Sequence, residues 1–147
     1  MDEKIKVLFL CTGNSCRSQM AEGWAKHLKS TVIEAYSAGI EIHGLNPNAV
    51  KVMAEAGVDI SAHTSKHVDE FKDVRLDFVV TVCGHAHETC PFFPGNCKVV
   101  HVGFDDPPEM AKERAENEAS AEEQIDCYRK VRDEIKAFVE TLPDALK

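Results

Sequence analysis

Short apolar segments alternate along this sequence with segments of helical periodicity, and this alternation constrains the fold more than any other feature. Strand-like runs occur at residues 5–10, 31–36, 78–82 and 98–102, and helical patterns occur at residues 18–29, 47–56 and 120–142. Strands that alternate with helices form βαβ units, so the pattern predicts an α/β fold with a parallel sheet. Ligands of such sheets bind beyond the carboxyl ends of the strands. The segments after residues 10 and 82 are therefore the expected sites of chemistry, and each begins with a cysteine.

The predicted helices carry their own start and stop signals. Asn46 and Pro47 suit the first positions of one helix, and Gly57 suits its end. Ser120 and Glu123 form a capping-box pattern at the start of the last helix. Apolar residues then recur at helical spacing, which predicts one face toward the core; they are Tyr128, Val131, Ile135, Phe138 and Leu142. The first helix should likewise bury Ala21, Trp24, Ala25 and Leu28.

Length and composition predict one ordinary globular domain spanning residues 1–147. The chain has 44% apolar and 29% charged residues, a composition that excludes extensive disorder. No apolar run approaches the roughly 18 residues needed to cross a bilayer. The charged first residues do not resemble a secretory signal. We therefore expect a cytoplasmic monomer that does not associate with membranes.

The net charge of −8 is concentrated in one segment. Residues 105–126 contain nine acidic and two basic residues, which gives this segment a net charge of −7. No basic stripe exists that could meet the phosphates of a nucleic acid, so nucleic acid is excluded as a partner. A small anion would need a strong local cradle rather than a favourable overall field.

The chain contains six cysteines, and their setting argues against a disulfide scaffold. Without an export signal they should be reduced thiols, so the pattern favours catalysis, redox chemistry or metal binding. They are Cys11, Cys16, Cys83, Cys90, Cys97 and Cys127.

The first cysteine opens a short loop between a predicted strand and a predicted helix. Successive backbone N–H groups in such a loop form a concave anion site, and the helix N-terminus adds positive potential. Arg17 could hold two oxygens of a tetrahedral anion. The same dipoles should lower the pKa of Cys11, which makes this thiol the candidate nucleophile. The predicted binding residues are Thr12, Gly13, Asn14, Ser15, Cys16, Arg17 and Ser18, with Cys16 expected to pack within the loop and Ser18 able to donate to the thiolate.

The segment from Cys11 to Ser18 resembles the Cys-x5-Arg-Ser loop shared by low-molecular-weight protein tyrosine phosphatases and thioredoxin-coupled arsenate reductases. Residues 11–23, 36–41 and 103–107 are more similar to the reductases. The resemblance runs from about residue 5 to residue 139. It implies an α/β fold with a four-stranded parallel sheet in the order 2-1-3-4, flanked by helices. It also implies arsenate as substrate, phosphate as a competing anion, and no cofactor.

The resemblance further implies a relay of three thiols. Cys11 would attack arsenic, Cys83 would attack Cys11, and Cys90 would attack Cys83, leaving a Cys83–Cys90 disulfide for thioredoxin to reduce. If the first and third strands are neighbours, Cys11 and Cys83 should lie within the range of a disulfide. In a helix, Cys83 and Cys90 would lie about 10 Å apart. We therefore predict that residues 83–97 unwind as a redox switch.

The segment after the fourth predicted strand supplies the expected proton donor. Its Asp-Pro pair matches the position of the family's general acid, so Asp106 is the predicted acid and Asp105 the second choice. Protonation of a departing hydroxide near neutral pH is a task for such a group. No aromatic residue follows the pair directly, which departs from the phosphatase pattern.

Some reductases of this family bind potassium beside the loop. Asn14, Glu22 and Ser37 match those ligand positions, but Lys66 stands at the remaining acidic position. Its ammonium group could take the place of the cation, so no bound metal is expected.

Two other functions stay open at the level of the sequence. A tyrosine phosphatase would use Cys11, Arg17 and Asp106 alone, and weak phosphatase activity is expected of a reductase too, because phosphate and arsenate share a geometry. A non-enzymatic metal- or redox-binding module would use the cysteines between residues 83 and 97. Their spacing, however, differs from the short Cys-x2–4-Cys pattern of zinc sites.

Overall fold

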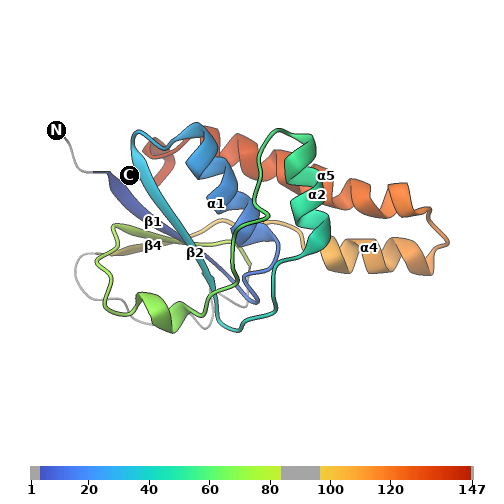
Figure 1. Cartoon of the computed structure of the whole chain (residues 1–147), viewed down its shortest axis with the longest axis horizontal. Helices are drawn as coiled ribbons and strands as arrows, with labels where there is room; N and C mark the ends of the chain where they lie inside the picture. Colours follow the sequence, from blue (N-terminus) through green and yellow to red (C-terminus); the bar gives the residue numbers. More distant parts are fainter. Residues whose placement is uncertain (1–3, 84–96, 147) are drawn as a thin grey trace.

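One sheet of four parallel strands forms the centre of the molecule (Figure 1). The computed structural model describes residues 4–83 and 97–146. The strand order is β2-β1-β3-β4, which confirms the predicted fold class and order. The strands are β1 (Ile5–Cys11), β2 (Ile33–Gly39), β3 (Phe78–Thr81) and β4 (Lys98–His101).

Helical elements cover both faces of this sheet. The helices are α1 (Arg17–Leu28), α2 (Pro47–Glu55), α4 (Pro107–Glu116) and α5 (Ala121–Glu140), with 3₁₀ turns η1 (Val68–Phe71) and η2 (Asp144–Leu146). In β2, Tyr36 packs on Phe71 of η1, whereas the next residue, Ser37, bonds Glu22 of α1. Successive side chains of a strand point to opposite faces, so η1 and α1 cover opposite faces. In the described part of the chain, no helix is long and apolar enough to cross a membrane.

The helix α5 buries most of its predicted apolar stripe. Tyr128, Val131 and Ile135 are buried, and so is Leu142, which lies two residues beyond the end of the helix. Phe138 lies at the edge of the stripe, where its ring packs edge-to-face on Phe104 with centroids 6.0 Å apart. Its neighbour Val139 is fully buried instead. Leu28, which was expected in the core, is 37% exposed at the last residue of α1.

The helix starts follow the predicted caps, whereas one strand begins later than predicted. The Asn46 side chain accepts two backbone N–H groups of the first turn of α2, and Ser120 closes the capping box of α5. The strand β2 begins at Ile33 rather than at residue 31. The Lys29 carbonyl accepts the N–H groups of both Val32 and Ile33, and this closed turn holds residues 31 and 32 out of the sheet.

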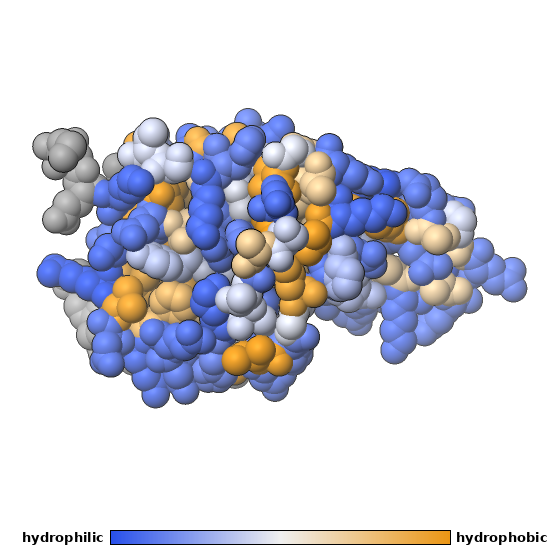
Figure 2. Space-filling model, in the orientation of Figure 1, coloured by the Kyte–Doolittle hydropathy of each residue, from blue (hydrophilic) through white to orange (hydrophobic). Residues whose placement is uncertain are grey.

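The helix α4 has no counterpart among the predicted elements. Only Pro107 among its ten residues is buried, so it has no apolar stripe to give a periodic signal. The helices α4 and α5 lie side by side and project beyond the end of the sheet (Figure 1). Figure 2 shows mostly hydrophilic residues over this projection. Residues 105–126, which carry the net charge of −7, make up much of it and are called the acidic hairpin below.

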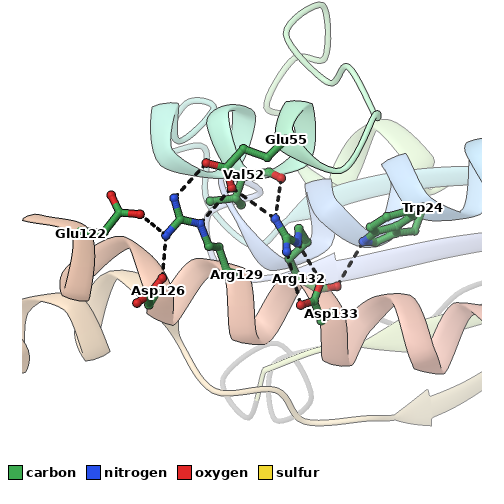
Figure 3. Close-up of polar contacts among 8 residues, drawn as sticks. All are labelled: Trp24, Val52, Glu55, Glu122, Asp126, Arg129, Arg132 and Asp133. Atoms are coloured by element: carbon green, nitrogen blue, oxygen red, sulfur yellow. Dashed lines mark hydrogen bonds and ion pairs between the residues drawn. The ribbon is translucent and has the colours of Figure 1, made fainter.

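Two arginines of α5 join this helix to α2 through their side chains and to α1 through a main-chain carbonyl (Figure 3). Arg129 donates through Nε and Nη2 to the two carboxylate oxygens of Glu55, at 2.9 Å each. Arg132 Nη1 donates to the carbonyl of Val52 at 2.9 Å, and its own carbonyl accepts from Trp24 Nε1 at 3.1 Å. These contacts fix the three helices that support one face of the sheet.

Replacing Arg129 by methionine should raise the pKa of Glu55. Arg129 is the main cause that holds this pKa below its ordinary value, and methionine removes the hydrogen bonds and the charge. Because the folded pKa is lowered, the pair stabilises the fold above the ordinary carboxyl pKa and loses this effect as the pH falls. NMR titration of the Glu55 carboxyl carbon measures the change. Lys51→Met removes a weaker influence and should move the pKa less; equal shifts would contradict this ranking.

Candidate active site

A cavity opens at the carboxyl end of β1, where the parallel sheet predicts a ligand. Its volume is about 360 Å³. The loop after β1 supplies most of its wall, and the segment after β2 and the start of α4 supply the rest. The lining residues are Cys11, Thr12, Gly13, Ser15, Cys16, Arg17, His43, Asn46, Asp106 and Pro108. Asn14 and Ser18, also predicted to bind the anion, are fully buried and do not line the cavity.

The carbonyl groups of the loop are bonded to the segment that follows β2. The bonds run from the N–H of Ile40 to Cys11 (3.1 Å), from Glu41 to Thr12 (2.8 Å), from His43 to Gly13 (3.0 Å) and from Asn46 to Ser15 (2.9 Å). In a trans peptide the N–H points opposite to the C=O. Among the described residues, no protein acceptor takes a hydrogen bond from the N–H groups of residues 13–16. These free donors form the anion cradle that the sequence predicts.

Two positions in and beside the loop have unusual backbone requirements. Asn14 has a φ of +49°, a left-handed conformation that is unfavourable for most residues. Gly39, at the end of β2, passes so close that a Cβ atom there would lie 2.7 Å from the Asn14 nitrogen and 2.8 Å from the Gly13 carbonyl carbon. The end of β2 can therefore support the loop only because residue 39 has no side chain.

Arg17 and Asp106 face each other across the cavity. Arg17 is the first residue of α1, and its Nη1 donates to the Phe104 carbonyl at 2.9 Å. Its Nη2 lies 3.8 Å from Asp106 Oδ2. Asp106 stands at the N-cap of α4, but its side chain makes no capping hydrogen bond. The carboxyl group thus remains directed toward Arg17, whereas the second choice, Asp105, is exposed and does not line the cavity.

The thiols of Cys11 and Cys83 meet beside this loop. Cys83 follows β3, which pairs with β1 so that Thr81 lies opposite Leu10. The two thiols are hydrogen-bonded to each other, and Thr12 Oγ1 lies 3.2 Å from Cys83 Sγ. Both cysteines are buried and unlinked. The predicted juxtaposition of these two sulfurs is therefore confirmed.

The expected low pKa of Cys11 is wrong for this arrangement. The hydrogen bond with Cys83 raises the pKa well above its ordinary value, and burial raises it further. The Arg17 charge and the Thr12 N–H act in the opposite direction but do not overcome this effect. The charge of one thiolate disfavours ionisation of the other, so adjacent thiols titrate as a pair. The sequence pattern showed the loop dipoles but not this coupling.

The other described cysteines are Cys16, Cys97 and Cys127. Burial raises the pKa of Cys16 to about 12, which agrees with its predicted role as a packing residue. Cys127 is fully buried on α5. Cys97 is partly buried at the start of β4. Cys90 lies outside the described residues, as does nearly all of the segment predicted to act as a redox switch.

Lys66 lines a second cavity together with Glu22 and Ser37. Its ammonium group donates to the Thr64 carbonyl at 3.0 Å. Lys26 pairs instead with the buried carboxylate of Glu22, which Ser37 also bonds. These residues do not fit a potassium ion, because an ammonium group already neutralises the carboxylate. Within residues 4–83 and 97–146, no group of three His, Cys, Asp or Glu side chains could hold a metal.

His43, Asn46 and the Phe104 carbonyl complete the site without having been predicted as part of it. His43 Nε2 lies 2.7 Å from Glu41 Oε2. A Cβ atom on Gly13 would come within 2.3 Å of His43 Nδ1, so this ring requires glycine at position 13. These groups come from irregular segments, which carry no periodicity or spacing that marks a site.

Comparisons with known proteins agree with this arrangement. A family model described as "Low molecular weight phosphotyrosine protein phosphatase" matches residues 6–147. An arsenate reductase of Halalkalibacterium halodurans is 52% identical, over 96% of this chain and 99% of its own. The chain belongs to the low molecular weight phosphotyrosine protein phosphatase family.

Two solved structures extend the likeness to three dimensions. One is described as an arsenate reductase in the phosphate binding state, with 32% identity, a TM-score of 0.72 and coverage of 97% of this chain and 99% of its own. The other, an arsenate reductase in the oxidized state, shows 31% identity, a TM-score of 0.72 and coverage of 97% and 98%. Both similarities span nearly the whole of each chain.

Replacing Gly39 by alanine should weaken oxyanion binding at least about tenfold, equivalent to ~1.4 kcal/mol. The added methyl group would displace Gly13 and Asn14 and disturb the cradle. Titration with phosphate as the test anion measures the affinity. Gly57→Ala is the matched control, because Gly57 has a φ of +85° but no atom near its Cβ position. That variant should lose stability and keep its phosphate affinity; equal affinities in both variants would contradict the role of Gly39.

Proposed function

We propose that this chain reduces arsenate to arsenite through Cys11, Cys83 and Cys90, and that thioredoxin then restores the thiols. The observation that carries the proposal is the contact between Cys11 and Cys83 beside an anion cradle. A hydrolase needs one nucleophilic thiol, whereas a two-electron reduction by thiols needs two that can form a disulfide. Membership in a family that includes arsenate reductases supports the same reaction. Residues 1–147 act as one catalytic domain and as a monomer.

Arsenate occupies the cradle before any bond changes. The free N–H groups of residues 13–16 point at its oxygens, and Arg17 holds two of them. Cys11 is the thiol that lines the cavity, and Arg17 and the Thr12 N–H both act to lower its pKa. Phosphate has the same shape and competes for the site.

The first covalent step joins Cys11 to arsenic. The Cys11 thiolate attacks arsenic, and one arsenic–oxygen bond breaks. Asp106, 3.8 Å from Arg17 across the cavity, donates a proton so that the oxygen leaves as water. Arsenic remains pentavalent at this stage, bound to sulfur.

The second step transfers the electrons. The Cys83 thiolate attacks the Cys11 sulfur and forms a disulfide, while the electron pair of the sulfur–arsenic bond stays on arsenic. Arsenic is thereby reduced from the pentavalent to the trivalent state, and arsenite leaves. The two sulfurs lose the two electrons that arsenic gains.

The third step moves the disulfide. The Cys90 thiolate attacks Cys83, which releases Cys11 as a thiolate and leaves a Cys83–Cys90 disulfide. A dithiol of thioredoxin reduces that bond by the same exchange and becomes oxidised itself. Exchange of this kind requires Cys90 to approach Cys83, which is the reason for predicting that residues 83–97 unwind.

Replacing Cys83 by serine should abolish thioredoxin-driven arsenate turnover. The variant retains Cys11 and the cradle but cannot form the first disulfide, so arsenite production should fall to the level measured without enzyme. A coupled assay with thioredoxin, its reductase and NADPH measures turnover. Cys127→Ala, at a buried thiol on α5 away from the cavity, should keep its activity. Sustained turnover by Cys83→Ser would refute the relay.

The position of the final disulfide tests the role of Cys90. After one turnover with arsenate and no thioredoxin, peptide mass mapping should find residues 83 and 90 crosslinked. A crosslink between residues 11 and 83 alone would place the end of the relay one step earlier and remove Cys90 from it.

A tyrosine phosphatase is the second candidate, favoured by the family model and by the Cys11, Arg17 and Asp106 geometry. Catalytic efficiency on an aryl phosphate, compared with that on arsenate plus thioredoxin, distinguishes the two. The proposal expects weak phosphatase activity and efficient reduction. Efficient ester hydrolysis without arsenate turnover would establish the hydrolase instead.

A further inference from the structure

The fully buried side chain of Gln19 lies against the anion loop but outside the cavity. Its Nε2 donates to the Asn14 carbonyl at 3.1 Å, to Asn14 Oδ1 at 3.0 Å and to the Thr64 carbonyl at 3.0 Å. Its Oε1 lies 3.0 Å from Nδ1 of His63. The proposed reaction gives Gln19 no role.

These contacts allow only one orientation of the Gln19 amide. Three partners of one terminal atom are carbonyl oxygens, so that atom must be the nitrogen donor. The other terminal atom is then an acceptor, and His63 Nδ1 must carry the hydrogen between them. Gln19 is therefore held at both ends of its amide group.

Gln19 supplies the one hydrogen bond that the loop otherwise lacks. The carbonyl groups of residues 11, 12, 13 and 15 accept N–H groups from the segment after β2. In the described residues, the Asn14 carbonyl accepts only from Gln19. Because the Asn14 carbonyl and the Ser15 N–H belong to one planar peptide, holding the carbonyl on one side aims the N–H at the other.

The same amide also holds the strained residue itself. Asn14 Oδ1 accepts from Gln19 and from the Lys66 N–H at 2.7 Å, and Asn14 Nδ2 donates to Ser18 Oγ at 2.9 Å. A left-handed conformation in a residue other than glycine persists only where its surroundings enforce it. Gln19 donates to both the main-chain and the side-chain oxygen of Asn14. These two hydrogen bonds help to hold Asn14 at its φ of +49°.

We propose that Gln19 is a positioning residue for oxyanion binding, which orients the Asn14–Ser15 peptide so that its N–H completes the cradle. The inference deepens the proposed function and rests on oxyanion binding by the loop, but not on the cysteine relay. It extends the set of binding determinants to a residue that never touches the anion.

The substitution Gln19→Glu tests this role with almost no change in shape. A carboxylate oxygen would replace the Nε2 donor and face three carbonyl oxygens, so the peptide should turn and the cradle should lose a donor. In the full-length reduced protein at pH 8, the dissociation constant for inorganic phosphate should rise at least about tenfold, equivalent to ~1.4 kcal/mol. Titration calorimetry measures it.

Measuring phosphate binding at two pH values distinguishes loss of the Gln19 hydrogen-bond donor from a general disturbance of the fold. At pH 5.5 the substituted carboxyl, surrounded by carbonyl oxygens, should bind a proton and donate again, so the ratio of variant to wild-type dissociation constants should fall. Gln19→Met has no donor at any pH and should show no such recovery. Using the ratio to wild type at each pH cancels the titration of phosphate. Gln19→Met keeps the neighbouring charged groups, so it shows their contribution; they are His63, Glu22, Lys26, Lys66 and Asp59.

Gln124→Glu is the matched control. Gln124 Nε2 donates to a single carbonyl, that of Ala119, at 3.0 Å in the acidic hairpin, so this variant should bind phosphate as the wild type does. If Gln19→Glu loses thermal stability but binds phosphate within twofold of wild type at pH 8, its role is structural only and the inference is overturned. If the wild type itself binds no phosphate, the oxyanion site fails and the inference fails with it.

Discussion

The chemistry of this protein depends on the way in which the carbonyl groups of one short loop are held. A backbone segment presents N–H groups to an anion only if its carbonyl oxygens have partners elsewhere. Here the segment after β2 provides four of those partners as backbone N–H groups, and the side chain of Gln19 provides a fifth. The close approach is possible because residues 13 and 39 are glycines. The cradle is therefore a product of contacts between segments distant in sequence, rather than of the loop alone.

The parallel sheet determines which thiols can cooperate. Pairing of β1 with β3 brings the residues after their carboxyl ends together, so that Cys11 and Cys83 share a hydrogen bond. That contact also raises the pKa of Cys11, and the positive charge of Arg17 only partly offsets the effect. Closeness of the two sulfurs thus favours disulfide formation and at the same time hinders ionisation of the nucleophile. The groups that oppose this effect on the Cys11 pKa are the Arg17 charge and the Thr12 N–H.

Much of the architecture was predictable from local patterns, because these patterns report local physics. The capping box at Ser120 and the apolar stripe of the last helix located α5, and the strand-then-loop pattern located the cavity at the end of β1. The helix α4 was not predictable, since it buries almost nothing. The pairing of Lys26 with Glu22 was not predictable either, because a match of sequence positions does not show where flexible side chains reach.

The acidic hairpin has a consequence for how substrate arrives. Its first helix begins beside Asp106, which lines the cavity, and its residues account for −7 of the net charge of −8. An incoming dianion must therefore cross a repulsive potential before the short-range donors can capture it. Dissolved ions shorten the range of that potential to about 8 Å at physiological ionic strength. The association of the anion with the cavity should consequently be faster at high ionic strength than in dilute buffer. A positively charged entrance would give the opposite dependence on salt.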